Sequence, residues 1–451
     1  MKRTALVLSF LLLLAACGSR VDTSATGPTA TVSPTGNGSS GSGGGTSAPA
    51  AADGNKIGTL TNPCSAKKAE GAAPTDTPGV SATTIKIGVI SDRKNDITPV
   101  PTIGVEEAAQ AFVDMCNDSG GINGRKLALT KYDSGILNTD AVTKQACQAG
   151  LFALVGDGSV QDQQGVPTRE ACGLPEIAAY AATSERSISK NFFSPVPGTQ
   201  PDKFNAGPCK FMADKFRAAT KKAAMIYTDV PASKVRGQAT IEACEKEGFK
   251  YVVQAGVAFG EKNFAPVVTQ MKDKGAKLLE VVSVVPDTLK ILQEVKRQGL
   301  DLDVVDLGQQ YYDPAMAQDP NADGAYVLTN TTPFKEKDST PALQVYDKWM
   351  KGGPETSLGV QAFSAGLLFA QAAASLGNDL TRDSLIAALK KIHEWDGGGL
   401  QLLADPGSNA HNDCYLYLQI KDKDFVRAFP KKGFSCAKDN VVTLSKKYLT
   451  S

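Results

Sequence analysis

The chain has 451 residues, of which 42% are hydrophobic and 21% charged, a composition typical of a soluble globular protein with two or three domain-sized cores. The formal net charge is +1, and the sequence has no basic stripe with interleaved aromatic residues. These features exclude nucleic acid as an expected partner.

The N-terminus has the parts of an export signal. Lys2 and Arg3 are positive, residues 5–14 are apolar, and small residues then lead to Cys17. Ten apolar residues are too few to span a bilayer as a stable helix. The pattern resembles the lipobox of bacterial lipoproteins, which predicts removal of residues 1–16 and acylation of Cys17, with palmitate as one possible chain. The alternative is a plain secretory signal followed by an incidental cysteine.

A region poor in large apolar residues follows the export signal. Residues 17–56 are mainly Gly, Ser, Thr, Pro and Ala, and such a segment cannot bury enough surface to offset its chain entropy. We therefore predict a flexible tether here. Residues 57–81 are transitional, and Cys64 is their expected anchor point.

The stretch from Thr84 to Ser134 predicts a β-α-β unit. Residues 85–90 alternate like a strand, apolar residues recur at helical spacing over 105–116, and residues 126–133 alternate again. Glu106 and Glu107 are expected on the solvated surface of that helix. The unit predicts a parallel sheet with a ligand crevice at the carboxyl ends of its strands.

The alternation of helices and strands continues along the chain. After the opening unit we expect helices at 140–148 and 162–172, strands at 151–156 and 174–178, an extended segment at 192–199 and a crossover near Pro201. A second series follows, with helices at 204–219, 234–247, 264–274 and 288–298, and strands at 223–228, 251–256, 278–284, 304–308 and 325–330. Helices are then expected at 340–350, 358–376 and 382–392, followed by a β-hairpin over 414–429.

Cysteine content indicates disulfides. Nine cysteines are present, and removal of the acylated Cys17 leaves an even number in an exported chain. Cys414 and Cys436 lie at the ends of the expected hairpin region, and Cys147 and Cys172 lie at the ends of consecutive helices, so both pairs are disulfide candidates. The other cysteines remain unpaired by this reasoning. No pair has metal-like spacing, and we expect no metal site.

Several motifs together resemble one protein family. They are IKIGVI at 85–90, the segment EEAAQAFVDMCNDSGGINGRKLALTKYD at 106–133, ALVGDGS at 153–159, CGLPEIAAYAATS at 172–184 and EKNFAPVVTQMKDKGAKLLEVVS at 261–283. The chain resembles the leucine/isoleucine/valine-binding (branched-chain amino acid) family of ABC-transporter substrate-binding proteins. The resemblance covers about residues 82–435.

This resemblance implies a fold and a division into lobes. The fold is that of a type I periplasmic binding protein, with two doubly wound parallel-sheet α/β lobes, a hinge and the C-terminal β-hairpin. Lobe 1 would comprise residues 82–199 and 331–398, and lobe 2 residues 200–330 and 399–451. The lobes would close over a small ligand at the hinge.

The resemblance also implies ligand contacts in lobe 1. In the family, the loops after the third and fourth strands hold a carboxylate of the ligand through hydroxyl groups and backbone N–H groups. The matching positions here are Ser159 and the loop Ala182, Thr183 and Ser184, with helix capping as the competing role for Ser159 and Thr183. The loop from Asp92 to Thr102, including Arg93, borders the expected cleft, although a solvated loop is an equal alternative.

In lobe 2 the sequence departs from the amino-acid binders. Gln310 stands nearest the position where they carry a carboxylate for the ammonium group of the ligand, and a neutral amide pairs weakly with a buried ammonium. Either Asp313 takes this role or the ligand has no α-ammonium, and we favour the second. Tyr227, Asp229, Tyr311 and Tyr312 are further candidates, with a core position as the alternative for the two adjacent tyrosines.

These features predict a monomeric, extracytoplasmic lipoprotein, anchored by lipid to the outer face of a bacterial cell membrane. It would capture a small polar molecule (an amino acid, amide or small carboxylate) and deliver it to the permease subunits of an ABC importer. A receptor of the same fold that signals to a membrane partner is the alternative. An α/β enzyme is disfavoured because the sequence has no GxGxxG after the first strand, no P-loop and no GxSxG, and no cofactor is expected.

Overall fold

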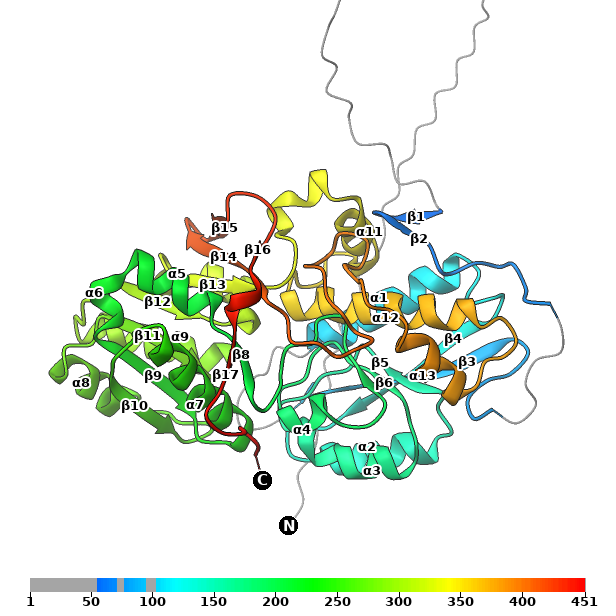
Figure 1. The fold of residues 1–451 in the computed structure, drawn as a ribbon, viewed down its shortest axis with the longest axis horizontal. Helices are drawn as coiled ribbons and strands as arrows, with labels where there is room; N and C mark the ends of the chain where they lie inside the picture. The colour runs from blue at the N-terminus through cyan, green and yellow to red at the C-terminus, as the bar shows by residue number, and fades with distance from the viewer. Residues whose placement is uncertain (1–54, 71–76, 95–102, 451) are drawn as a thin grey trace, which may run out of the picture. The chain divides into compact units, whose positions relative to one another are not determined.

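The computed structural model describes residues 55–70, 77–94 and 103–450, and the following description is confined to them. The predicted export signal (1–16), Cys17, nearly all of the predicted tether (17–56) and Thr102 lie outside the described residues. The described chain folds around two β-sheets covered by helices (Figure 1).

The first sheet is wholly parallel, with strand order β4-β3-β5-β6-β7. Its strands are β3 (Thr84–Ser91), β4 (Lys126–Asp133), β5 (Ala153–Val155), β6 (Glu176–Ile177) and β7 (Phe192–Phe193). The predicted alternation is visible in β3, where Ile85, Ile87 and Val89 are buried while Lys86 is exposed. This confirms the parallel β-α-β unit predicted for the start of the folded region.

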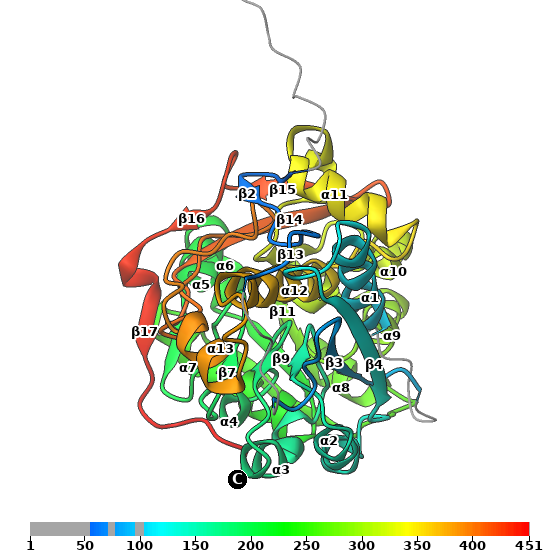
Figure 2. The ribbon, with the colours of Figure 1, turned by 90° about the vertical axis from the view of Figure 1, so that its right-hand side faces the viewer.

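Helices from two distant parts of the sequence cover this sheet. They are α1 (Ile103–Asp118), α2 (Thr139–Gln148), α3 (Val166–Ala171), α4 (Ser184–Ser187), α11 (Pro341–Met350), α12 (Ser357–Ser375) and α13 (Arg382–Leu389), with the 3-10 turns η1 (Asp162–Gly165) and η4 (Phe334–Ser339). Figures 1 and 2 both show α1 beside α12. The helices approach closely at Gly366, where a Cβ would lie 2.3 Å from the Phe112 ring, so any larger residue would push them apart.

The second sheet is mixed, with strand order β10-β9-β11-β12-β13-β14-β15. Strands β9 to β13 run parallel, and the hairpin β14–β15 adds two antiparallel strands at the β13 edge. The strands are β9 (Ala223–Thr228), β10 (Tyr251–Val257), β11 (Leu278–Val282), β12 (Val304–Leu307), β13 (Tyr326–Thr329), β14 (Cys414–Lys421) and β15 (Asp424–Phe429), and β16 (Ser435–Cys436) pairs with β14. The predicted C-terminal hairpin is therefore present, as part of this sheet.

The elements around the second sheet include α5 (Gly207–Lys215), α6 (Arg217–Thr220), α7 (Pro231–Lys246), α8 (Ala265–Asp273), α9 (Val285–Arg297) and α10 (Pro314–Gln318), with the turns η2 (Gln309–Tyr311), η3 (Pro320–Ala322) and η5 (Lys438–Asn440). A short ladder joins β8 (Lys203–Asn205) to β17 (Val441–Thr443). The helix predicted over 204–219 is wrong at its start, because Phe204 pairs with Val442 in this ladder and α5 begins only at Gly207, with Pro208 in its first turn.

The helix predicted over 162–172 is also shorter than expected. Residues 162–165 form a 3-10 turn, and α3 begins at Val166 with Pro167 in its first turn. Proline is tolerated at such a helix start because it has no N–H to donate. The side chain of Asp162 is used elsewhere, as described below.

The described chain passes between the two sheets at three places, around residues 194–203, 330–333 and 399–413. These segments contact one another: Thr331 pairs with Gln401, and Gln401 Nε2 donates a hydrogen bond to the Pro195 carbonyl over 2.6 Å. The connecting segments are thus hydrogen-bonded to one another, although the bonded residues are 70 and 206 positions apart in sequence.

Disulfides tie both sheet regions. Among the described residues the pairs are Cys64–Cys116, Cys147–Cys172, Cys209–Cys244 and Cys414–Cys436. Two of them are the pairs expected from the sequence, and the other two join elements whose proximity the sequence pattern did not reveal. The first joins the segment before β3 to α1, where Ser65 N also donates to the Gly121 carbonyl over 2.7 Å. The hairpin of β1 (Lys56–Ile57) and β2 (Leu60–Thr61) precedes it.

Helix α12 is long and apolar enough to cross a membrane by length and composition alone. Nearly nine-tenths of that stretch is buried within the protein, against α1 and the first sheet. It is therefore the central core helix of the described fold.

Candidate ligand-binding cavity

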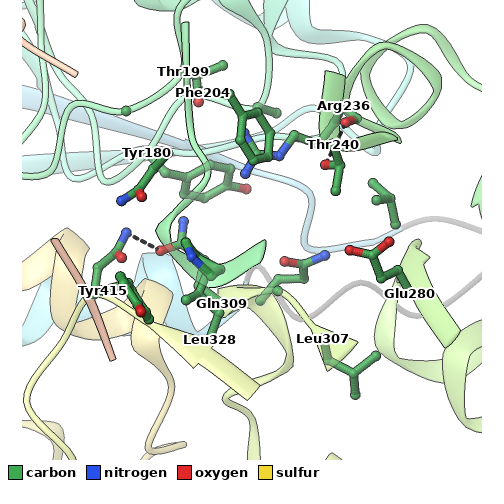
Figure 3. Close-up of a pocket in the computed structure, with 18 of the residues that line it drawn as sticks. Tyr180, Thr199, Phe204, Arg236, Thr240, Glu280, Leu307, Gln309, Leu328 and Tyr415 are labelled. Atoms are coloured by element: carbon green, nitrogen blue, oxygen red, sulfur yellow. Dashed lines mark hydrogen bonds between the residues drawn. The ribbon is translucent and has the colours of Figure 1, made fainter. Parts of the chain in front are cut away.

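A cavity of about 330 Å³, here named the central cavity, lies between groups from the two sheet regions. Its volume falls within the range of about 300–1,000 Å³ for small-molecule sites. The lining residues come from loops after β5 and β6, the segment before β8, helix α7, and the carboxyl ends of β11, β12 and β13. Those labelled in Figure 3 are Tyr180, Thr199, Phe204, Arg236, Thr240, Glu280, Leu307, Gln309, Leu328 and Tyr415.

On the first-sheet side, the donors of the loop after β6 are already used. The carboxylate of Asp162 accepts hydrogen bonds from the backbone N–H of Ala182 over 2.6 Å and from the Thr183 hydroxyl over 2.5 Å. Asp162 is buried, and burial raises the pKa of its carboxyl to about 6, while the positive charge of Arg186 opposes that rise. A carboxylate of the chain itself thus occupies two of the groups predicted to hold a carboxylate of the ligand, the Ala182 N–H and the Thr183 hydroxyl.

The loop after β5 is used in the same way. The carboxylate of Asp92, at the end of β3, accepts hydrogen bonds from the backbone N–H groups of Val160 over 2.7 Å and Ile136 over 2.8 Å, and from the Ser134 hydroxyl. Burial raises the pKa of Asp92, and the hydroxyl and backbone donors oppose the rise. Asp92 therefore joins three segments of the first sheet.

A buried charge cluster supports both loops from behind. Arg186 lies among three carboxylates, with nitrogen–oxygen distances of 2.5 Å to Asp157, 2.9 Å to Glu176 and 3.3 Å to Asp162. Arg169 also pairs with Glu176, at 3.2 Å. Burial and repulsion by Glu176 raise the pKa of Asp157 far above its ordinary value. Because three acids face two arginines, a proton on Asp157 leaves the cluster close to neutral.

The second-sheet side of the cavity carries a positive side chain, Arg236, that has no carboxylate partner among the described residues. Arg236 lies on the face of α7 that Ala232, Ser233, Thr240 and Cys244 also use to line the central cavity. Its side chain is accessible from the cavity, and its guanidinium lies 4.4 Å over the Phe204 ring (Figure 3). Enclosure by protein lowers the pKa of Arg236 to about 10, so the group stays protonated at neutral pH. In the part of the chain that the structure describes, no carboxylate forms an ion pair with it.

Two acids lie in another part of the cavity wall. Glu280 and Asp306 are adjacent in the β11–β12 register, and each accepts a hydrogen bond from a tyrosine hydroxyl: Glu280 from Tyr251 at 2.5 Å, Asp306 from Tyr417 at 2.9 Å. Burial raises the pKa of Glu280 to about 7. Burial and the neighbouring Glu280 charge raise the pKa of Asp306 strongly. The two acids therefore hold at least one proton near neutral pH.

Amide groups connect the two sheet regions at the cavity floor. The Gln309 carbonyl oxygen accepts hydrogen bonds from Asn330 Nδ2 over 2.8 Å and from Gln361 Nε2, on α12, over 3.0 Å. The Asn330–Gln309 bond is drawn in Figure 3. These amides are uncharged, so they offer hydrogen bonds to a ligand without setting its charge.

His411 is a further lining residue. Its Nδ1 lies 3.0 Å from the Asn412 carbonyl oxygen, which can only accept, so Nδ1 carries the proton and Nε2 is left as an acceptor. Burial lowers the pKa of His411 to about 4, and the charges of Arg236 and Lys203 add to this effect. His411 is thus neutral and lies in a positive field.

Of the residues that the sequence proposed for ligand contact, Ala182 and Gln310 line the central cavity. The others in the described chain do not, and they have identifiable structural partners or positions. Thr183 caps α4 by accepting from Arg186 N, Ser184 is the first residue of that helix, and Asp313 caps α10 by accepting from Ala315 N.

The remaining candidates lie in the core or in other contacts. Tyr311 is fully buried, and its hydroxyl is hydrogen-bonded to Ser283 and Thr288. Tyr312 is buried, and its hydroxyl oxygen accepts a hydrogen bond from the Phe334 N–H. Three others are Tyr227, which packs against Gly237, Asp229, which pairs with Lys234, and Ser159, which is buried beside the charge cluster. Arg93 pairs with Glu106 at 2.7 Å. The expectation that Glu106 is solvated is wrong, because Ser91, Arg93 and Lys131 surround its 6%-exposed carboxylate.

Among the lining residues that sequence reasoning missed are Arg236, Phe204, Gln309, Asn330, Glu280 and His411. Each is an isolated residue within an ordinary helix, strand or loop, so no local motif marks it. The described chain also brings Asp413, Cys414 and Cys436 within 4.8 Å of one another, but the two cysteines form a disulfide and are not free to bind a metal.

Comparison with known proteins adds to these observations. A model of the family described as periplasmic binding protein matches residues 84–424. The chain is 24% identical over 209 residues to Leu/Ile/Val-binding protein homolog 1 of Brucella suis biovar 1 (strain 1330), an alignment that covers 44% of this chain and 53% of that protein. The chain thus spans about half the length of this curated relative.

Solved structures share the fold. A fatty acid ABC transporter substrate-binding protein from Thermomonospora curvata superposes with a TM-score of 0.67 at 18% identity, over 81% of this chain and 96% of that one. A solute-binding protein of an ABC transporter from R. palustris, in complex with 4-hydroxybenzoate, superposes with a TM-score of 0.65 at 16% identity, over 79% and 98%. At these identities the comparison establishes a common fold with two sheet regions.

Proposed function

Because the chain belongs to the periplasmic binding protein family, we propose that it is the extracytoplasmic solute-binding protein of an ABC importer. It captures a small polar molecule in the central cavity and delivers it to membrane permease subunits. The observation that carries this proposal is the central cavity itself, which has a small-molecule volume and is lined from both sheet regions.

The three segments that connect the two sheets support a mechanism in which the two lobes close over the ligand. The division into lobe 1 (82–199 and 331–398) and lobe 2 (200–330 and 399–451) places its boundaries within or next to the three connecting segments. These segments are hydrogen-bonded to one another near Pro195, Thr331 and Gln401. A ligand that contacts both walls favours the closed arrangement by its differential affinity for that state.

The ligands named for similar proteins indicate a chemical class for the ligand of this chain. They are Leu/Ile/Val, a fatty acid and 4-hydroxybenzoate, which all carry a carboxylate and an apolar part. We propose a ligand among amino acids, amides and small carboxylates, with Ala182 and Gln310 in contact with it. The chain acts without a cofactor and without covalent chemistry in this proposal.

A thermal-shift screen tests the binding function. The purified full-length protein is heated with amino acids, small carboxylates, amides and sugars, and one class is expected to raise Tm in a concentration-dependent way. At 100 times Kd a ligand adds about 2.7 kcal/mol of stability. Turnover of a metabolite, or no shift with any class, would contradict the proposal.

We also propose that Cys17 is acylated and anchors the protein to the outer face of the cell membrane. Export fits membership in a periplasmic family, and two or more acyl chains hold a protein stably at a bilayer. Cys17→Ala should move the protein from the membrane fraction to the soluble fraction. Retention of the variant in the membrane fraction would contradict the anchor.

A further inference from the structure

Two features of the central cavity bear on the charge of its ligand. The first is that two of the predicted anion-binding groups, those of Ala182 and Thr183, are occupied from within the chain, as is the neighbouring N–H of Val160. The backbone N–H of Val160 donates to Asp92, and the N–H of Ala182 and the hydroxyl of Thr183 donate to Asp162. A second carboxylate bound by these groups would have to displace Asp162 from Ala182 and Thr183 and would meet the charge already present.

The second feature is the charge at the Arg236 end. Arg236 extends from α7 into the cavity and rests on Phe204, and no described carboxylate pairs with it. Another titratable residue of the cavity wall, His411, is held neutral by burial and by the charges of Arg236 and Lys203. An anion entering the cavity therefore finds a cation that needs no displacement of an existing partner.

The other charged groups of the wall are poor partners for an ammonium group. Glu280 and Asp306 are bound by the hydroxyls of Tyr251 and Tyr417, and the pair retains a proton near neutral pH. Asp313, the alternative acid, caps α10 away from the cavity. Apolar side chains complete the walls, among them Leu307, Leu328 and Val284.

We propose that Arg236 binds the carboxylate of a ligand that has an apolar body and no ammonium group. The ligand's anion is thus recognised by helix α7 on the second-sheet side, while the Thr183 loop serves to hold Asp162. This inference rests on the proposed binding function and specifies the chemistry of that same site. The guanidinium is suited to it because its planar fork offers two parallel N–H groups to a carboxylate.

The test uses matched probes with the full-length protein. Benzoate and 4-methylpentanoate supply a carboxylate with an apolar body; benzamide and 4-methylpentanamide have the same shape without the charge; L-leucine adds an ammonium group to 4-methylpentanoate. Calorimetry and thermal shift are run on the wild type, Arg236→Gln, Arg236→Lys and Arg217→Gln. Arg217 is exposed on α6 and outside the cavity wall, so its variant controls for the loss of one arginine.

At least one carboxylate is expected to bind, with its amide at least tenfold weaker. Arg236→Gln should abolish this discrimination, Arg236→Lys should keep part of it, and Arg217→Gln should leave it unchanged. The Tm of each variant without ligand is measured in parallel, so that a folding defect is recognised by a lower Tm and is not read as lost binding.

Three outcomes overturn the inference while the binding function stands. They are carboxylate binding that Arg236→Gln does not weaken, equal binding of acid and amide, and binding of L-leucine without binding of 4-methylpentanoate. If no compound of any class binds, the proposed function fails and the inference fails with it.

Discussion

Two arginines of this protein, one buried and one exposed, lie in opposite electrostatic surroundings. Arg186, behind the loops of the first sheet, has three carboxylates within 3.3 Å, whereas Arg236, on α7, faces the central cavity and an aromatic ring. The first arrangement satisfies the cation completely and leaves nothing for a ligand. The comparison teaches that a site is indicated less by the presence of a charged group than by the absence of an internal partner for it.

The largest expected effect on the free energy of unfolding comes from replacing Arg186. Arg186→Gln leaves Asp157, Asp162 and Glu176 buried with one cation fewer, and removal of one partner from a buried pair costs about 3–5 kcal/mol. Chemical denaturation should show a loss of this size, whereas Arg236→Gln should change the unfolding free energy little. Equal losses of unfolding free energy in the two variants would contradict the difference between the two arginines.

The acids of the cavity wall should make stability depend on pH. In the folded state Glu280 keeps its proton up to about pH 7. In the unfolded state its carboxyl has a pKa near 4.5 and loses the proton at lower pH. Unfolding then releases a proton, and stability falls as pH rises from about 4.5 to 7. Each pKa unit corresponds to about 1.36 kcal/mol, so this fall is at most about 3 kcal/mol.

Glu280→Gln cannot ionise and should lack this contribution. Denaturation at pH 5 and pH 8 should show that the variant gains stability relative to the wild type between the two values. The same pH slope in both proteins would mean that Glu280 is ionised in the folded state across this range.

A smaller loss of stability is expected for Gly158→Ala, in a first-sheet loop that packs against the cavity residue Tyr180. A Cβ on Gly158 would lie 2.3 Å from the Tyr180 ring, so Gly158→Ala must push that ring aside. Overpacking of this kind costs about 1–3 kcal/mol. The displaced ring should also weaken carboxylate and amide probes alike, because it alters shape and not charge. A loss confined to the carboxylate would place anion recognition on this side after all.

The smallest effect on stability and affinity is expected at Thr183, which the family resemblance proposed as a ligand contact. Thr183→Val removes the cap of α4 and a hydrogen bond to Asp162, and loss of a cap costs about 1 kcal/mol. The affinity for a carboxylate probe should stay within a factor of about two of the wild type, measured by calorimetry. A tenfold loss of affinity would indicate that Thr183 contacts the ligand.

The sequence predicted the fold well because its signals are local. Alternation in β3 and β4, the apolar stripe of α1 and the glycine turn at residues 120–121 each lie within a few residues, and the hairpin β14–β15 does as well. Where local signals failed, a distant partner decided the structure. Phe204 was expected in a helix but pairs with Val442, more than 200 residues away.

The site was less predictable for the same reason. The loop residues Ala182 and Thr183 were located correctly in sequence, but their donors are taken by Asp162, twenty residues earlier, through a contact that no spacing rule reveals. Asp313 and Thr183 have the residue types that bind ligands and cap helices equally well. Arg236 is one arginine on a helix with many polar residues, and only the arrangement of α7, Phe204 and the sheet ends distinguishes it from a surface charge.

The Cys64–Cys116 disulfide has a mechanical consequence. A pull exerted from the N-terminal side enters the folded chain near Lys56 and reaches α1 through a covalent bond at residue 64. The residues between the two cysteines, which are 52 positions apart, include β3 and form a loop outside the covalent path of this tension. Strand β3, Asp92 and most of α1 lie within this loop, so the covalent path of the load bypasses them and continues from Cys116 toward β4.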